Sequence, residues 1–209
     1  MARYDEMMFT PAVEARQDGI ASKGKFASRY SQIERQQIGP VEIAFLLDRS
    51  TIYIATVGET GWPYIQHRGG ARGFIKLIDE TTIGFADYLG NRQLISAGNL
   101  DGDDRVSVFA MDYACKARLK IQGHAKMLDV KDHPELTLKL MDDGAKTPDR
   151  LMTIQITAHD WNCPKYITPR FDAGEMTQLV GPELGRLEAR IAELETENER
   201  LRTGQGEQP

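Results

Sequence analysis

The sequence predicts a mostly β domain with flanking helices, built as an antiparallel barrel or sandwich and followed by a coiled-coil helix. About six short segments with strand-like apolar patterns follow one another at short spacing, and few helices separate them. This arrangement is typical of antiparallel sheets and not of repeated βαβ units. Near the end of the chain, apolar residues recur three and four positions apart, which indicates a helix of the coiled-coil type.

The composition is that of one main globular domain. The chain has 209 residues, of which 41% are hydrophobic and 27% charged. A domain of up to roughly 200 residues buries enough surface to fold without a metal or disulfide. No apolar stretch approaches the roughly 20 residues of a membrane span, and no apolar signal core follows the first residues. The sequence therefore predicts no membrane partner.

The charge distribution and the cysteines argue against a nucleic-acid-binding surface, a metal site and a disulfide framework. The 26 basic and 31 acidic residues are interspersed, so we expect no surface for nucleic acid. Cys115 and Cys163 form neither a CxxC pair nor a Cys/His ligand set. This usage predicts a cytoplasmic protein with no metal site and no disulfide framework.

Residues 1–39 are predicted to form a helical N-terminal extension. Thr10 is placed to cap a helix that has Pro11 in its first turn. A second helical stretch is expected after Gly24, through Phe26, Tyr30 and Ile33.

Residues 40–180 contain the predicted barrel. The first two strands form a hairpin, because β-branched and apolar runs flank a turn that contains glycine. The fifth strand alternates most clearly, with Arg118 and Lys120 on a polar face that is either wet or turned to a ligand. Strands are expected at 51–57, 63–68, 82–87, 105–111, 117–125 and 152–158, and helices at 41–48, 91–99 and 132–142.

Residues 181–209 form the predicted coiled-coil helix and a polar tail, after a break at Gly181-Pro182. An Asn at an a position favours a parallel dimer, because its amide pairs with its twin only in the correct register. The alternative is an amphipathic helix packed on its own barrel. The heptad seam consists of Leu184, Leu187, Ile191, Leu194, Asn198 and Leu201.

Familiar catalytic motifs are missing from the sequence. No GxGxxG follows a strand, no complete phosphate-binding loop is present, and neither HExxH nor GxSxG occurs. The sequence therefore gives no support to a dinucleotide fold or to the familiar hydrolases.

The end of the second predicted strand carries the first candidate site. Gln66, His67 and Arg68 have high hydrogen-bonding capacity, and Gly69 then lets another group approach the backbone closely. Such a surface suits a flat polar ligand. The alternative is an ordinary solvated strand end.

A second candidate lies where the strand ending at Asp87 turns into a predicted helix. Asn91 is a plausible N-cap, and the free N–H groups of a helix start together with Arg92 favour a phosphate. Arg118 and Lys120 could add charge to the same anion if the sheet curls back, or they could form only a wet face. Trp161 is either a ligand-side aromatic or a core or interface residue.

The order of these segments resembles the pyridoxamine 5′-phosphate oxidase-like family of FMN-binding split barrels. The segments PYIQHRGG, TIGFADYLGNRQ and ARLKIQGHA carry the resemblance, which covers about residues 40–170. Within that family, the WNCP segment near the end is similar to an uncharacterised flavin-binding branch.

The resemblance implies a split-barrel homodimer with two FMN molecules in clefts at the subunit interface. The strand at residues 66–68 would run beside the flavin ring, and Arg92 and Gln93 would bind the phosphate. Arg118 and Lys120 would approach the ribityl chain or phosphate. Trp161 and Arg170 are candidates offered by the other subunit. The implied FMN-binding residues are Gln66, His67, Arg68, Gly69, Phe85, Ala86, Asp87, Asn91, Arg92, Gln93, Arg118, Lys120, Trp161 and Arg170.

Departures from the oxidases indicate a different substrate. Gln66 and Ala71 stand where the oxidases carry Arg and Lys, Gln93 replaces a Lys, and no Arg-x-His motif follows Trp161. We therefore predict an FMN-dependent oxidoreductase whose substrate is not pyridoxamine phosphate. His67 or Arg68 could stabilise the reduced flavin, and no catalytic residue is assigned.

Two alternatives remain open at this point. The protein could bind or store flavin, or act as a flavin-binding sensor, without turnover. The barrel could also hold haem or a deazaflavin. The sequence does not identify the substrate or the electron donor.

Overall fold

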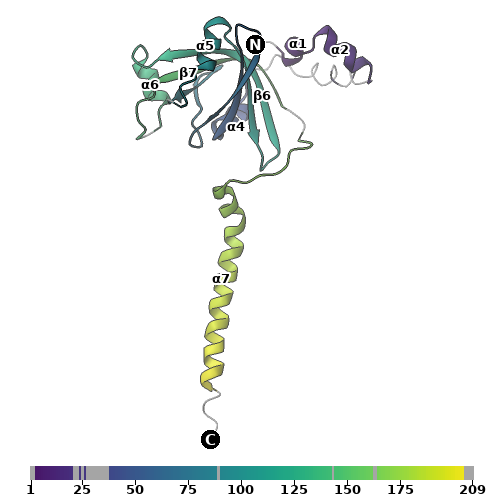
Figure 1. Ribbon diagram of the computed structural model, residues 1–209. Helices are drawn as coiled ribbons and strands as arrows, with labels where there is room; N and C mark the ends of the chain where they lie inside the picture. The colour runs from purple at the N-terminus through teal and green to yellow at the C-terminus, as the bar shows by residue number, and fades with distance from the viewer. Residues whose placement is uncertain are drawn as a thin grey trace. The chain divides into compact units, whose positions relative to one another are not determined.

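The computed structural model describes residues 3–20, 24, 26, 38–88, 90–142, 144–161 and 164–204. The chain divides into two compact units. The first comprises Met1–Asp112 and Lys116–Tyr166, and the second comprises Tyr113–Cys115 and Ile167–Pro209. The first unit holds the sheet and the second holds the long C-terminal helix (Figure 1).

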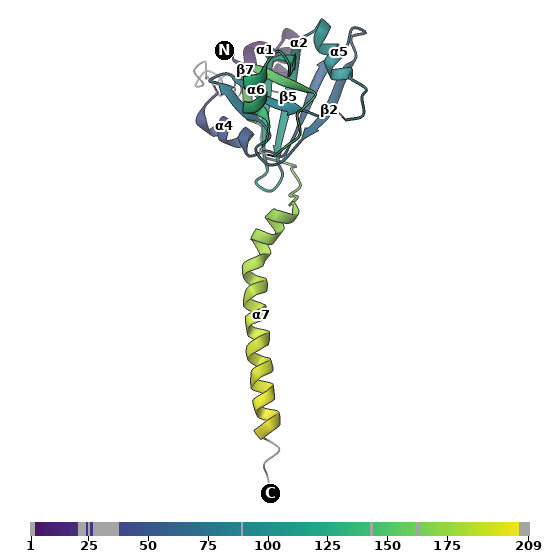
Figure 2. The same ribbon diagram turned by 90° about the vertical axis from the view of Figure 1, so that its left-hand side faces the viewer.

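The first unit is a single antiparallel sheet that curves around its core, as Figures 1 and 2 show. Its strand order is β2-β1-β5-β6-β7-β4-β3. The predicted fold class, a split antiparallel barrel with flanking helices, is confirmed. The strands are β1 Thr51–Val57, β2 Pro63–Gly69, β3 Lys76–Asp79, β4 Thr82–Asp87, β5 Arg105–Asp112, β6 Ala117–Asp129 and β7 Arg150–Trp161.

The β1–β2 register decides which side chains of β2 face the inside of the barrel. Ile52 and Ile54 of β1 are buried, and they lie opposite Arg68 and Gln66. Alternate residues of a strand point to opposite faces. Arg68 and Gln66 therefore share the inner face, whereas His67 points outward.

A β-bulge changes the face of β7 near its end. Gln122 pairs with Ala158 but Gly123 pairs with Ile156, so β7 has one extra residue at this point. Any side chain at Gly123 would clash, because an added Cβ would lie 2.5 Å from the carbonyl oxygen of Gln155. The simple alternation predicted over 152–158 is therefore wrong at Ala158, which packs with Tyr4 outside the main core.

Short helices flank the sheet. The predicted capping by Thr10 is confirmed, because its Oγ1 accepts a hydrogen bond from the Val13 N–H at 3.4 Å. Phe26 is helical as predicted, but Gly24 is helical too, although it was expected to precede this helix; Tyr30 and Ile33 lie outside the described residues. The helices of this unit whose two ends lie within the described residues are α1 Tyr4–Met8, α2 Pro11–Asp18, α4 Pro40–Leu47, α5 Ile95–Gly102 and α6 Pro134–Leu140.

The start of α5 differs from the prediction. Asn91 is not its N-cap, because the helix begins at Ile95 and its N-cap is Leu94. The Asn91 Oδ1 instead accepts a hydrogen bond from the Gln93 N–H at 3.1 Å, which is a local turn that competes with helix formation. Arg92 and Leu94 then adopt left-handed backbone conformations, with φ of 61° and 56°.

The second unit contains α7, Ala173–Gly204. The helix begins with a reciprocal cap, in which the Glu175 N–H donates to Asp172 Oδ1 and the Asp172 N–H donates to Glu175 Oε2. It continues through Pro182, so the predicted break at Gly181-Pro182 is wrong. An interior proline removes one backbone hydrogen bond and crowds the carbonyl four residues earlier, and the helix nevertheless continues across Pro182.

Among the helices of the described residues, none is both long and apolar enough to cross a membrane.

Candidate functional site

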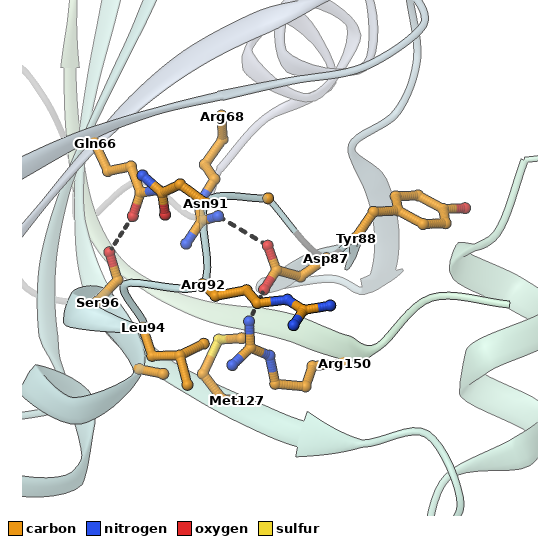
Figure 3. Close-up of a pocket in the computed structure, with 12 residues that line it drawn as sticks. Gln66, Arg68, Asp87, Tyr88, Asn91, Arg92, Leu94, Ser96, Met127 and Arg150 are labelled. Carbon is orange, nitrogen blue, oxygen red and sulfur yellow. Dashed lines mark hydrogen bonds and ion pairs between the residues drawn. The ribbon is translucent and has the colours of Figure 1, made fainter. Parts of the chain in front are cut away.

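A cavity of about 150 Å³ opens where β2 and β4 end and β7 begins, beside the segment that leads into α5 (Figure 3). β4 and β7 are neighbours, and Asp87 at the end of β4 lies opposite Arg150 at the start of β7. β2 belongs to the other edge of the sheet and completes the wall because the sheet curls. The lining residues are Gln66, Arg68, Asp87, Tyr88, Gly90, Asn91, Arg92, Leu94, Ser96, Ala97, Met127 and Arg150.

Asp87 is the electrostatic centre of this cavity. Its side chain is only 4% exposed, and each carboxylate oxygen accepts a hydrogen bond from a different arginine. Arg68 Nη1 lies 2.8 Å from Oδ1, and Arg150 Nη2 lies 2.9 Å from Oδ2. A buried carboxylate requires such pairing to remain charged. The Arg68–Asp87 pair also ties β2 to β4 and so closes the barrel at this end.

The cavity has more positive than negative charge. Arg68, Arg92 and Arg150 all line it, against the single carboxylate of Asp87. The Nε atoms of Arg68 and Arg150 are buried and have no hydrogen-bond partner among the described residues. Arg92 is exposed and forms no ion pair within the part of the chain that the structure describes. This excess of guanidinium groups suits a multiply charged oxyanion such as phosphate.

Neutral side chains complete the lining. Ser96, buried in the first turn of α5, donates a hydrogen bond from Oγ to Gln66 Oε1 at 2.8 Å. Leu94 is 50% exposed and gives the cavity an apolar edge, whereas the ring of Tyr88, which is 42% exposed, points away from the other lining side chains (Figure 3).

The backbone beside Arg92 is unusual. A left-handed conformation is uncommon in residues other than glycine, and it costs on the order of 1–3 kcal/mol where the surroundings impose it. Arg92 and Leu94 both adopt it within three residues. Such strained residues cluster at ligand-binding sites.

The structure brings together five of the predicted site residues and adds seven others, among them Arg150 and Ser96. Gln66, Arg68, Asp87, Asn91 and Arg92 line one cavity. Reasoning from the sequence missed Arg150 and Ser96. The only sequence signal for Arg150 is that it directly precedes an apolar strand, and this does not reveal which strand it faces.

Five other predicted residues lie outside this cavity. His67 is on the outer face, with its ring 5.7 Å from that of Tyr53. Phe85 is in the core against Phe74, and Ala86 pairs with Leu151 inside the sheet. The remaining two residues, Gly69 and Gln93, are exposed and do not line the cavity.

Arg118 and Lys120 do not reach this cavity within one chain. Arg118 precedes Met127, the β6 residue that lines the cavity, by nine positions on the same strand, a separation of roughly 30 Å. The Lys120 ammonium pairs with Asp160 at 3.1 Å and lies over the ring of Tyr4. The curl of the sheet therefore does not add their charge to the same anion, contrary to expectation.

Trp161 lies in a different cluster, under α4. Its Nε1–H donates to Glu42 Oε1 at 2.7 Å, and its ring packs edge-on against Phe45. His159, two residues earlier, has its Nε2 4.0 Å from the same carboxylate oxygen. Arg170 belongs to the second unit, where its guanidinium lies over the ring of Tyr113.

Burial and hydrogen bonding shift the pKa values of this cluster. Burial lowers the pKa of His159, and the charges of Glu42 and Asp160 oppose that change only in part. Burial also acts to raise the pKa of Glu42, but hydrogen bonds from Trp161, its own backbone N–H and Gly39, together with His159, bring it below its ordinary value. At neutral pH the cluster therefore holds a carboxylate and a neutral imidazole.

Among the described residues, no group of three or more His, Cys, Asp and Glu side chains is arranged to hold a metal ion.

The fold and the cavity define a split-barrel domain with an arginine-lined cavity at one end. Residues 42–161, more than half of the chain, match the family model described as pyridoxamine 5′-phosphate oxidase. The chain belongs to this family.

Solved structures with a similar fold have low sequence identity to this chain. HupZ from Group A Streptococcus has 14% identity and a TM-score of 0.46, covering 64% of this chain and 100% of that chain. A protein of the pyridoxinephosphate oxidase family from Clostridium acetobutylicum, related to general stress protein 26, has 14% identity and a TM-score of 0.42, covering 57% and 83%. An F420 reductase has 17% identity and a TM-score of 0.40, covering 55% and 93%. No curated protein matches the chain.

Proposed function

We propose that this protein is a homodimeric, FMN-dependent oxidoreductase whose phosphate site is the cavity between Arg68, Arg92 and Arg150. The observation that carries the proposal is the excess of guanidinium groups around one buried carboxylate. Family membership supports the class of cofactor, because the resemblance implies an FMN-binding split barrel.

The residues present fit the terminal phosphate of FMN. Asp87 holds two guanidiniums in place, so their remaining N–H groups are oriented before a ligand arrives. The buried, unpartnered Nε atoms of Arg68 and Arg150 show that these arginines have unused donor capacity. Arg92 adds an exposed charge at the rim, where it can close on the anion.

The size of the cavity supports a second subunit. A volume of about 150 Å³ accepts a phosphoryl group but is smaller than the roughly 300–1,000 Å³ of a pocket for a whole cofactor. The flavin ring would therefore lie outside it, past the exposed edge formed by Leu94. A second copy of the chain would cover this edge and provide the remaining contacts, among which Arg118, Lys120, Trp161 and Arg170 stay candidates.

The flavin, when bound, supplies hydride or electron transfer. The chain's own residues bind and orient it, and none needs to act as a nucleophile. Arg68 lines the cavity, whereas His67 points to the outer face, so Arg68 is the one of the two that can place charge near the cofactor held by its own chain. The proposal includes a cytoplasmic location, which the cysteine usage of the sequence favours.

The test compares FMN with riboflavin, which lacks the phosphate. Replacing Arg92 by Ala removes a charge-assisted hydrogen bond worth about 1.5–3 kcal/mol, so the Kd for FMN should rise about 10- to 150-fold. Riboflavin affinity should stay the same. Arg16→Ala, an exposed arginine on α2 that does not line the cavity, is the matched control and should leave both affinities unchanged.

Two results would overturn the proposal. One is a purified protein that is colourless and does not bind added FMN. The other is an Arg92→Ala variant that keeps the parent's FMN affinity. The mass and spectrum of the copurifying chromophore separate FMN from haem and deazaflavin.

Turnover is tested by anaerobic reduction with a nicotinamide cofactor, followed by reoxidation. Reduction within a turnover time supports the oxidoreductase. A bound flavin that resists reduction would instead indicate a flavin-binding or flavin-storage protein.

A further inference from the structure

The long helix α7 presents an apolar stripe that nothing in its own unit covers among the described residues. Leu184, Leu187, Ile191, Leu194 and Leu201 are each between 41% and 59% exposed. They recur at spacings of three and four, which places them along one face of the helix. Such a stripe on a helix with charged remaining faces requires a partner.

We propose that the partner is α7 of a second copy of this chain, bound parallel and in register as a two-stranded coiled coil. In the heptad assignment, Leu184, Ile191 and Asn198 occupy a positions. Leu187, Leu194 and Leu201 occupy d positions, and Ile at a with Leu at d favours two strands. The seam covers about three heptads, roughly 30 Å of helix.

Asn198 favours the parallel arrangement. In a parallel, in-register pair the two Asn198 side chains meet each other, and their amides can form hydrogen bonds across the seam. In an antiparallel pair centred on the seam, a positions face d positions, so Asn198 would face Leu187 of the other chain. That arrangement leaves a polar amide against an apolar side chain.

The charges beside the seam are complementary in the same arrangement. In a parallel pair, each g residue faces the e residue five positions later in the partner chain. Arg190 then faces Glu195, and two-fold symmetry forms this pair twice. Glu197 likewise faces Arg202. One unfavourable pair remains, between Glu183 and Glu188.

Cysteine cross-linking of the full chain tests the arrangement directly. Leu187→Cys and Leu201→Cys place single cysteines at two d positions that are 14 residues apart. Ala189→Cys and Thr203→Cys, also 14 residues apart, place them on the outer f positions as matched controls. Under mild oxidation, both d variants should give a disulfide-linked dimer at several times the yield of both f variants and of the parent chain.

The pattern of cross-links decides between the arrangements. An antiparallel pair brings a residue close to its twin at no more than one place along the helix, so at most one of the two d variants would cross-link. Cross-linking of neither d variant above the f controls would exclude the parallel, in-register coiled coil. Either outcome overturns the proposal, whether or not the protein binds flavin.

A charge exchange provides a second readout. In the Leu201→Cys chain, Arg190→Glu should lower the cross-linked yield, because Glu would face Glu195 of the partner. Adding Glu195→Arg should restore it. Arg190 also pairs with Glu193 of its own helix at 2.8 Å, and Glu195→Arg does not rebuild that contact. A loss that Glu195→Arg fails to restore would contradict the proposed pairing.

Discussion

Two carboxylates of the first unit, one buried and one largely shielded from water, have their hydrogen-bonding capacity satisfied in different ways. Asp87 is 4% exposed and is held by two guanidiniums, from Arg68 and Arg150. Glu42 is 14% exposed and accepts hydrogen bonds from Trp161 and from the backbone N–H of Gly39. Both are satisfied, but only the Asp87 cluster has more cationic groups than it needs.

This difference indicates where a ligand can bind. The donors around Glu42 are mostly neutral and bind its carboxylate, and the one buried group of this cluster without a hydrogen-bond partner among the described residues is the Nδ1 of His159, which carries no charge surplus. Around Asp87, the arginines keep unused N–H groups and face a cavity. Asp87, which has more arginines around it than it needs, therefore lies beside a candidate anion site. Glu42, whose donors are mostly neutral, instead links α4 to β7.

The largest effect is expected for Asp87→Asn. Removing one partner of a buried ion pair costs about 3–5 kcal/mol, because the arginines lose their counter-charge. Phosphate should restore more stability to this variant than to the parent. Denaturant unfolding in phosphate and in chloride at equal ionic strength measures both effects.

Asp142→Asn is the matched control for Asp87→Asn. Asp142 pairs with Lys76 at 3.0 Å, but both side chains are about one third exposed. Its loss should cost less than about 1 kcal/mol. If the two variants are equally stable, the Asp87 cluster does not have the role assigned to it.

Glu42→Ala should have a smaller effect that is confined to stability. It leaves the Trp161 Nε1–H and the Gly39 N–H without their acceptor, which costs about 1–3 kcal/mol for a buried donor. Glu42→Gln keeps a side-chain oxygen and should lose less. Anion affinity at the Asp87 cavity should not change in either variant, and a change in it would contradict the separation of the two clusters.

The fold was largely predictable from local sequence, but the site was predictable only in part. The main strands follow from alternation and β-branched runs, whereas β3 was missed because KLID is four residues long and shows no clear period. Gln66, Arg68, Asp87 and Arg92 stood out because they lie at strand ends and turns.

The rest depends on contacts that local sequence does not specify. Arg150 meets Asp87 across 63 positions of sequence, through a pairing of β4 with β7 that no local pattern reveals. The helix start at Ile95 was misplaced because Asn91 can cap a helix or form a local turn, and only the fold decides between them.

The pH dependence of stability should distinguish the Glu42–His159 cluster from the Asp87 cluster. Burial lowers the pKa of His159, so the unfolded chain binds a proton that the folded chain resists. Stability should therefore fall as the pH drops below about 6.5, the ordinary pKa of histidine, until the folded protein is protonated as well. The lowered pKa of Glu42 adds a further loss at more acidic pH, below about 4.5.

His159→Gln should remove the part of this slope between about pH 6.5 and pH 5. The exposed His133→Gln is the control and should keep the parent's dependence. Denaturant midpoints measured across this range give the comparison. A His159→Gln profile that matches the parent would show that the imidazole is not the group responsible.

The smallest effect on stability is expected for Arg105→Gln, which removes the arginine from an arginine–carboxylate pair at the protein surface. The side-chain hydrogen bonds of Arg105, and next its backbone N–H, lower the pKa of Asp103 to about 2. In NMR titration, the variant's Asp103 pKa should rise only part of the way towards 3.8, because the backbone donor remains. Asp79, whose pKa is lowered chiefly by the Thr81 backbone N–H, serves as an unchanged internal reference.

The unfolding midpoint of the Arg105→Gln variant should stay at the parent's value because water solvates both groups of this pair. A midpoint shift as large as that of Asp87→Asn would mean that burial is not what distinguishes these carboxylates.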